Sequence, residues 1–285
     1  MISNLSWRGR SLLLLSTAFS LGISLLGPAT SAEAPPPLLL PNKHPITGPR
    51  TRLKGHWVGV QPVSPWLKIV VMAGHADSQG MRGSGTSGAA VDLKGAAPMD
   101  PRMRDELYWN RKVRDAVVSL SQKRGLKISS YDPKALSIAK ASDPRTNWSV
   151  ARRLSRQGDY ILEIHFDAYS PHGYGSGLIP ALNRKLNRVD ESLAQSFGRF
   201  PRLFRGGLGG PRRGISILEI GMLEGVLEAN LRNPKTSEAT IQAIALKVSD
   251  ALMLGVRGKT SSNPPHGEVD NAPPTSNPQT NSEVE

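Results

Sequence analysis

The chain has 285 residues, enough for one domain of ordinary to large size with tails, and it contains no cysteine. Disulfides, thiolate metal sites and a cysteine nucleophile are therefore excluded, and any metal has to be held by histidine, aspartate or glutamate. The formal net charge is +13, and residues 33–258 carry 33 of the 36 basic and 19 of the 23 acidic residues. Such a charge favours a polyanionic partner, which would be nucleic acid, anionic lipid or an anionic cell-wall polymer.

The first 32 residues have the pattern of a secretory signal peptide. Two arginines precede a charge-free apolar run at residues 11–26, and small residues follow it up to Ala32, after which we expect cleavage. The run of 16 residues is short for a membrane span, and an uncleaved anchor is the alternative. We therefore expect export to the periplasm or cell envelope, no stable membrane insertion after cleavage, and no nucleic-acid partner.

Three further segments follow the signal peptide. Residues 33–65 are rich in proline and are expected to form a linker or loosely attached arm without a core. A single domain is expected over residues 66–257, and residues 258–285 are expected to be a disordered tail. The first strand of the domain is predicted at residues 66–73 and stops before His75, which therefore lies just beyond a strand end.

Residues 83–88 read Gly-Ser-Gly-Thr-Ser-Gly, which is a literal match to the dinucleotide-binding fingerprint. The match starts ten residues after the predicted strand instead of at its end. No helical pattern opens directly at Gly88, where a pyrophosphate would have to lie. A nucleotide-dependent oxidoreductase is therefore the outside alternative.

A helix is predicted from Asp105 to Lys123, because apolar residues recur there at spacings of three and four. Acidic residues open the segment, and basic residues with a glycine close it. Glu106 lies in the first turn and falls on the inward, apolar stripe of this helix. A short strand is expected at residues 127–131 and a short helix at residues 147–157.

The chain is organised around a predicted buried strand at residues 159–167. Alternation puts an apolar set on one face and an ionisable set on the other: Tyr160, Leu162, Ile164 and Phe166 against Ile161, Glu163, His165 and Asp167. Three ionisable groups on one buried face are costly unless they are paired, solvated at the rim or bound to a metal. A metal site is our hypothesis, and a satisfied core histidine with acids that meet arginines is the alternative.

The remaining predicted elements are a glycine-rich loop, a helix, a strand and a closing helix, at residues 170–177, 189–197, 215–221 and 237–254. His172 is expected to be a loop residue and not a metal ligand. Residues 184–213 are rich in arginine and glycine and are expected to form a solvated basic rim. Glu219 lies at the carboxyl end of the strand predicted at residues 215–221.

Alternating strands and helices predict an α/β fold, a single three-layer domain with a mostly parallel central sheet and helices on both faces. In open α/β sheets the ligand crevice lies outside the carboxyl ends of the strands. His75, His165 and Glu219 fall at such ends, and Glu106 can approach the same edge. Two imidazoles and one carboxylate leave a fourth zinc position for water, which is typical of hydrolytic zinc sites, and the remaining glutamate would be a general base.

Four short motifs then match a known family in order and context: 70–75 (Val-Val-Met-Ala-Gly-His), Glu106 with Asn110, Ile164-His165, and 218–221 (Leu-Glu-Ile-Gly). Over residues 66–254 the chain resembles the zinc-dependent N-acetylmuramoyl-L-alanine amidases of bacterial cell-wall turnover. The resemblance implies a zinc site of His75, Glu106 and His165 with Glu219 as catalytic acid/base. It also implies hydrolysis of the amide between N-acetylmuramic acid and L-alanine in peptidoglycan or muropeptides.

The chain departs from the family pattern in several places. Ala76 and Asp77 replace two glycines, Glu163 stands where the family usually has serine, and Asp167 where it tends to have asparagine. The extra acids would change the properties of the metal, bind a cationic group such as the amine of diaminopimelate, or pair with the arginines of residues 184–213. Of these we expect the arginine pairing.

Two alternatives to the amidase remain at this point. The first is another zinc amidohydrolase or a carboxypeptidase-like enzyme that uses the same ligands on a different amide. The second is a non-catalytic cell-wall-binding module that keeps the fold and the basic surface.

Overall fold

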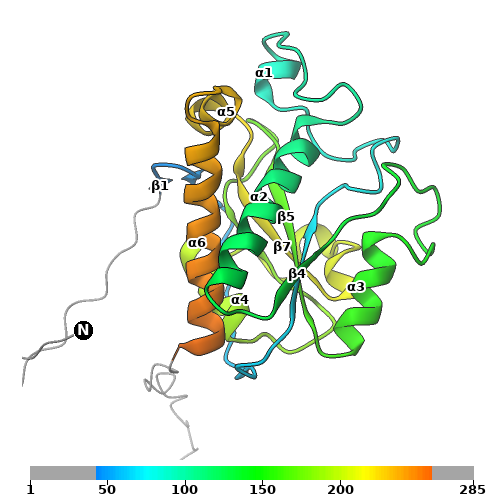
Figure 1. The fold of residues 1–285 in the computed structure, drawn as a ribbon, viewed down its shortest axis with the longest axis vertical. Helices are drawn as coiled ribbons and strands as arrows, with labels where there is room; N and C mark the ends of the chain where they lie inside the picture. Colours follow the sequence, from blue (N-terminus) through cyan, green and yellow to red (C-terminus); the bar gives the residue numbers. More distant parts are fainter. Residues whose placement is uncertain (1–42, 259–285) are drawn as a thin grey trace, which may run out of the picture. The chain divides into compact units, whose positions relative to one another are not determined.

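The computed structural model describes residues 43–258, and its centre is a five-stranded sheet (Figure 1). The strands lie in the order β4-β3-β5-β7-β6, and every neighbouring pair is parallel except β6 with β7. Their bounds are Ile69–Ala73 for β3, Ile128–Tyr131 for β4, Tyr160–Asp167 for β5, Gly177–Ile179 for β6 and Ile215–Met222 for β7. The predicted mostly parallel α/β sheet is confirmed.

Helices cover both faces of the sheet (Figure 1). The alternation predicted for β5 sorts its side chains, since Tyr160 and Leu162 join one core cluster and Ile161 joins the other. The first cluster packs beneath α2, α4, α5 and α6, and the second beneath α3. The helix bounds are Asp105–Lys123 for α2, Asn147–Arg156 for α3, Arg188–Phe197 for α4, Gly225–Arg232 for α5 and Ser237–Arg257 for α6. The three-layer arrangement is therefore as predicted.

The strands and helices predicted over residues 66–257 match their predicted bounds within three residues, whereas several short elements were not predicted. The short elements are the one-turn helix α1 (Ala89–Asp92), the 3-10 turns η1 (Phe204–Gly206) and η2 (Pro211–Arg213), β6 and α5. Strand β6 is three residues long and follows a glycine-rich loop, and α5 begins at a glycine. Such segments are too short to show an apolar period.

The expectation of a loose arm without a core is wrong for residues 43–65. A small hairpin opens this segment, with β1 at Lys43–His44 and β2 at Gly48–Pro49. The Thr51 N–H then donates to the Ser176 carbonyl at 2.8 Å, and the Trp57 indole N–H donates to the Phe200 carbonyl at 2.7 Å. The prolines keep the backbone extended, but its polar groups and one large aromatic side chain still find partners on the domain. The predicted signal peptide and tail lie outside the described residues.

Of the helices described between residues 43 and 258, α6 is long and apolar enough to cross a membrane. However, 56% of the apolar stretch is buried inside the protein. It packs against α2, α4 and α5, and Ile241, Ile244, Val248 and Leu252 belong to the main core cluster. This burial is what a core helix of an α/β domain shows.

The predicted basic rim is only partly solvated, because Arg184 is largely buried and is paired with the fully buried Asp190. Its guanidinium binds both carboxylate oxygens of Asp190, at 2.6 and 2.9 Å, and lies over the Tyr160 ring. Asp190 also accepts hydrogen bonds from the Tyr160 and Ser216 hydroxyls, at 2.9 and 3.0 Å. Burial, together with the nearby Asp190, raises the pKa of Tyr160 well above its ordinary value. Arg202 and Arg205 are exposed, as expected of a rim.

This buried pair gives a stability prediction. Asp190→Ala leaves the Arg184 charge without its partner, and breaking a buried pair in this way costs about 3–5 kcal/mol. The free energy of unfolding in urea should fall by that amount. Glu238→Gln is the control, since Glu238 is exposed and bonds only to Gln242, and it should change the free energy by less than about 0.5 kcal/mol. Equal free energies for both variants would contradict the prediction.

Candidate metal centre

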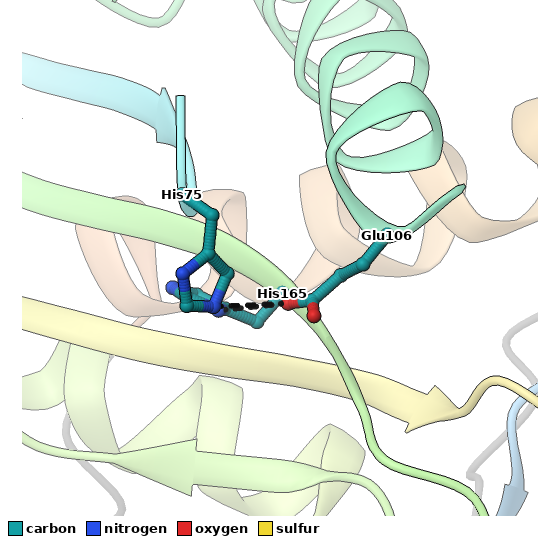
Figure 2. A group of neighbouring side chains, drawn as sticks. All are labelled: His75, Glu106 and His165. Carbon is teal, nitrogen blue, oxygen red and sulfur yellow. Dashed lines mark hydrogen bonds and ion pairs between the residues drawn. The ribbon is translucent and has the colours of Figure 1, made fainter. Parts of the chain in front are cut away.

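Three of the four predicted site residues meet at the carboxyl edge of the sheet (Figure 2). His75 follows β3, Glu106 lies in the first turn of α2, and His165 is near the end of β5. Glu106 Oε1 lies 3.5 Å from His75 Nε2 and 3.1 Å from His165 Nδ1. One ligand atom from each of the three residues falls within 4.8 Å of the other two.

Two of the three candidate ligands are buried, and the opposite charges of Glu106 and His165 stabilise each other. Glu106 is 3% exposed and His165 is 8% exposed. Burial opposes a charge on His165, but hydrogen bonds to Glu106 and Glu163 outweigh it and raise the pKa of His165 well above its ordinary value. Burial also opposes the Glu106 carboxylate, yet His75 and His165 lower its pKa. Burial, on the other hand, lowers the pKa of His75.

The donor set fits a zinc ion. Two imidazole nitrogens and one carboxylate oxygen are the ligands that a catalytic zinc takes from protein. Each ligand also has an outer partner on its far atom. Thr86 N–H donates to Glu106 Oε2 at 2.8 Å, Ser84 Oγ lies 3.2 Å from His75 Nδ1, and Glu163 Oε2 lies 3.2 Å from His165 Nε2. Outer partners of this kind orient metal ligands in proteins. The near atoms are thereby left facing one another.

Glu219 is the fourth predicted residue, and it comes from β7 directly beside His165 in the strand register. It lines the same cavity as the three candidate ligands, with a volume of about 550 Å³. Its Oε2 atom is buried and has no hydrogen-bond partner among residues 43–258. Burial raises the pKa of Glu219 well above its ordinary value. A buried carboxyl oxygen without a partner beside a metal-type cluster is positioned for proton transfer.

The expected pairing of the extra acids with arginines is wrong. Glu163 Oε2 lies 3.2 Å from His165 Nε2, and Glu163 Oε1 accepts from Asn147 Nδ2 at 2.8 Å. Asp167 accepts from the backbone N–H groups of Ala168, Tyr174 and Gly175. Within the described residues neither carboxylate forms an ion pair with an arginine, because α3 and the loop after β5 reach these positions first. His172 is an exposed turn residue, as predicted.

The glycine-rich loop at residues 83–88 wraps the candidate ligands. Helix α1 does open directly after Gly88, contrary to expectation. However, the N–H of Ala90 at its start donates to both carboxylate oxygens of Glu228, at 3.0 Å. A pyrophosphate on this helix would have to displace that carboxylate, so the geometry disfavours nucleotide binding.

Sequence reasoning missed Ser84, Asn147 and Arg205. Ser84 and Asn147 touch the ligands or their partners, and the signal for Ser84 was its place in the glycine-rich loop. Arg205 has a left-handed backbone, with φ of 50°, and it lines the cavity with its guanidinium over the Phe204 ring. Two glycines follow it, which marks an unusual turn.

No protein-family model matches the chain, and no curated protein matches it in sequence. Several solved structures are similar to it at low identity. The catalytic domain of CwlV, an N-acetylmuramoyl-L-alanine amidase from Bacillus (Paenibacillus) polymyxa var. colistinus, is 15% identical, with a TM-score of 0.45 over 68% of this chain and 100% of that one. Ami1, an N-acetylmuramyl-L-alanine amidase from Mycobacterium abscessus, is 16% identical, with a TM-score of 0.42 over 65% and 98%. The CwlD amidase from Clostridioides difficile, solved with the GerS lipoprotein, is 14% identical, with a TM-score of 0.42 over 65% and 96%.

Proposed function

We propose that the protein is an exported zinc-dependent hydrolase that cleaves the amide between N-acetylmuramic acid and L-alanine in peptidoglycan or muropeptides. The carrying observation is the convergence of His75, Glu106 and His165 in one cavity with the unpartnered carboxyl oxygen of Glu219. The order of the four motifs along the chain supports the amidase chemistry, and the N-terminal signal pattern supports export to the periplasm or cell envelope.

Three residues would bind the metal, and Glu219 would transfer the protons. Zinc, when bound by His75, Glu106 and His165, supplies a Lewis acid that polarises the scissile carbonyl and activates water. Glu219 takes a proton from the attacking water and returns it to the leaving amine. Its raised pKa suits this exchange, because a group that both accepts and donates works best with a pKa near the working pH.

Arg205 offers an anionic substrate a positive group at the cavity. Residues 33–258 hold 33 basic against 19 acidic residues, and Arg205 lines the cavity. Within the described part of the chain no carboxylate forms an ion pair with Arg205, whereas Glu106, Glu163 and Asp167 all have partners inside the protein. A stem peptide with free carboxylates would find its positive counterpart in Arg205.

Metal analysis and product analysis test the proposal together. The purified protein should hold about one zinc per chain, and His165→Ala should hold none, because two donors do not retain the ion. Mass spectrometry of digested sacculi should find peptides with a newly freed N-terminal alanine.

Each alternative has its own product pattern. A carboxypeptidase-like enzyme would release single amino acids from the peptide end. A wall-binding module would bind sacculi and release nothing. Either result, or zinc-free wild-type protein after metal-replete preparation, would overturn the proposal.

A further inference from the structure

We propose that Glu163 is a positioning residue that commits His165 to holding the metal through Nδ1. It does so by accepting a hydrogen bond from the protonated Nε2. The inference rests on the proposed zinc site but concerns a residue outside the ligand set.

The two ring nitrogens of His165 face different acids. Nε2 lies 3.2 Å from Glu163 Oε2, and Nδ1 lies 3.1 Å from Glu106 Oε1 on the side of His75. A neutral imidazole carries one proton, so one nitrogen donates and the other offers a lone pair. An ionised carboxylate can only accept. A histidine that holds a metal is neutral, and Glu106 would then be a ligand itself, so Glu163 is the carboxylate that remains to hold the proton on Nε2 and leave the lone pair at Nδ1.

Glu163 is itself held in a single orientation. It is 5% exposed, and its Oε1 accepts from Asn147 Nδ2 at 2.8 Å. The same amide nitrogen donates to the carbonyl of Ala73 at 2.8 Å, so both of its protons are used. Turning the Asn147 amide over would place its oxygen against two acceptors. The hydrogen bonds thus run from Asn147 to Glu163 and from His165 to Glu163.

The other histidine lacks such a commitment. His75 Nδ1 lies 3.2 Å from the Ser84 hydroxyl, which in turn lies 2.5 Å from the Ser78 hydroxyl. A hydroxyl either donates or accepts, so this pair adapts to whichever tautomer His75 adopts. Control over the tautomer is therefore concentrated at Glu163.

Glu163→Gln keeps the size of the side chain and breaks the pattern of acceptors. If the new amide oxygen faces Asn147, the new NH₂ group faces His165 Nε2 and favours the proton on Nδ1, where it blocks the metal. If the amide is reversed, two NH₂ groups face each other. Either arrangement should lower zinc affinity by about 10- to 100-fold, the usual cost of losing an outer partner.

The experiment uses the full chain and needs no substrate. Zinc affinity is measured by competition with a chromophoric chelator for wild type, Glu163→Gln and Glu228→Gln. Glu228 is the matched control, because it is equally buried and its carboxylate binds the Ala90 N–H and no histidine. Nitrogen-15 NMR of the zinc-loaded wild type should show His165 with a metal-shifted Nδ1 and a protonated Nε2. This second measurement does not depend on how well any variant folds.

The outcomes separate this inference from the amidase proposal. Unchanged zinc affinity in Glu163→Gln, or zinc on Nε2 of His165, overturns the role of Glu163 even where muropeptides are cleaved normally. Zinc on Nδ1 with weakened binding in Glu163→Gln supports the inference even where no muropeptide is cleaved, and the amidase proposal then fails alone. Absence of zinc from the wild type overturns both.

Discussion

Glu219→Gln is expected to abolish amide hydrolysis while leaving zinc content and sacculus binding unchanged. Removing a general acid/base typically lowers the rate by about 10²- to 10⁴-fold. Gln has the same shape as Glu but cannot accept and return a proton. The measurement is kcat on a purified muropeptide, together with zinc per chain and sacculus pull-down of the same preparation.

The fold should tolerate this change well. Burial disfavours the charged form of Glu219 and raises its pKa, so ionising this carboxyl costs the folded protein free energy. A raised carboxyl pKa stabilises the fold below the ordinary pKa, and that contribution is lost as the pH rises through the folded-state value. A glutamine has no charge to bury at any pH. The free energy of unfolding of the Glu219→Gln protein at pH 7 should therefore equal or exceed that of the wild type.

Glu228→Gln is the control for Glu219→Gln, since it also neutralises a buried carboxylate. The carboxylate of Glu228 accepts a hydrogen bond from the Ala90 N–H, and Glu228 does not line the cavity. It should keep the hydrolytic rate of the wild type. A Glu219→Gln enzyme within tenfold of the wild-type rate would remove Glu219 from the mechanism.

The sequence predicted those parts of the site that depend on strand ends and strand faces. Alternation along residues 159–167 placed Glu163 and His165 on one face, and the carboxyl edge of a parallel sheet brought His75 and Glu219 to the same place. Both inferences follow from regular geometry that repeats every two residues or at every strand.

The partners of these residues could not be predicted in the same way. Glu163 meets Asn147 only because α3 begins beside β5, and the sequence offered many arginines as equally good partners. The segment at residues 43–65 was misjudged for a related reason. A proline-rich sequence predicts an extended backbone, but it does not predict whether Trp57 and Thr51 contact the rest of the domain.

Gly74→Ala is expected to cost both zinc and activity, although it removes no donor. A Cβ at this position would lie 2.2 Å from His165 Cε1 and 2.3 Å from Nε2, where no methyl group fits. The Gly74 backbone has little freedom to retreat, since its N–H donates to the Ile164 carbonyl at 2.9 Å and its carbonyl accepts from Asn110 Nδ2 at 3.1 Å. The imidazole must therefore move.

Displacing the ring separates Nε2 from Glu163 and shifts Nδ1 away from Glu106. Zinc affinity should fall at least as far as in Glu163→Gln, by about 10- to 100-fold, and kcat by about 10²-fold. Overpacking should cost about 1–3 kcal/mol of the free energy of unfolding. Chelator competition, the muropeptide assay and urea unfolding measure the three effects.

Gly210→Ala is the control for Gly74→Ala, because Gly210 lines the cavity and the atoms nearest to its added Cβ would be those of the Ile215 and Ile217 side chains, at 3.5 Å or more. It should bind zinc like the wild type. If Gly74→Ala also binds zinc like the wild type, the imidazole of His165 can accommodate the added methyl group, and contact with Gly74 does not set its position. If Gly74→Ala alone loses zinc, the close approach of one glycine to one ring is as necessary for the site as the donors themselves.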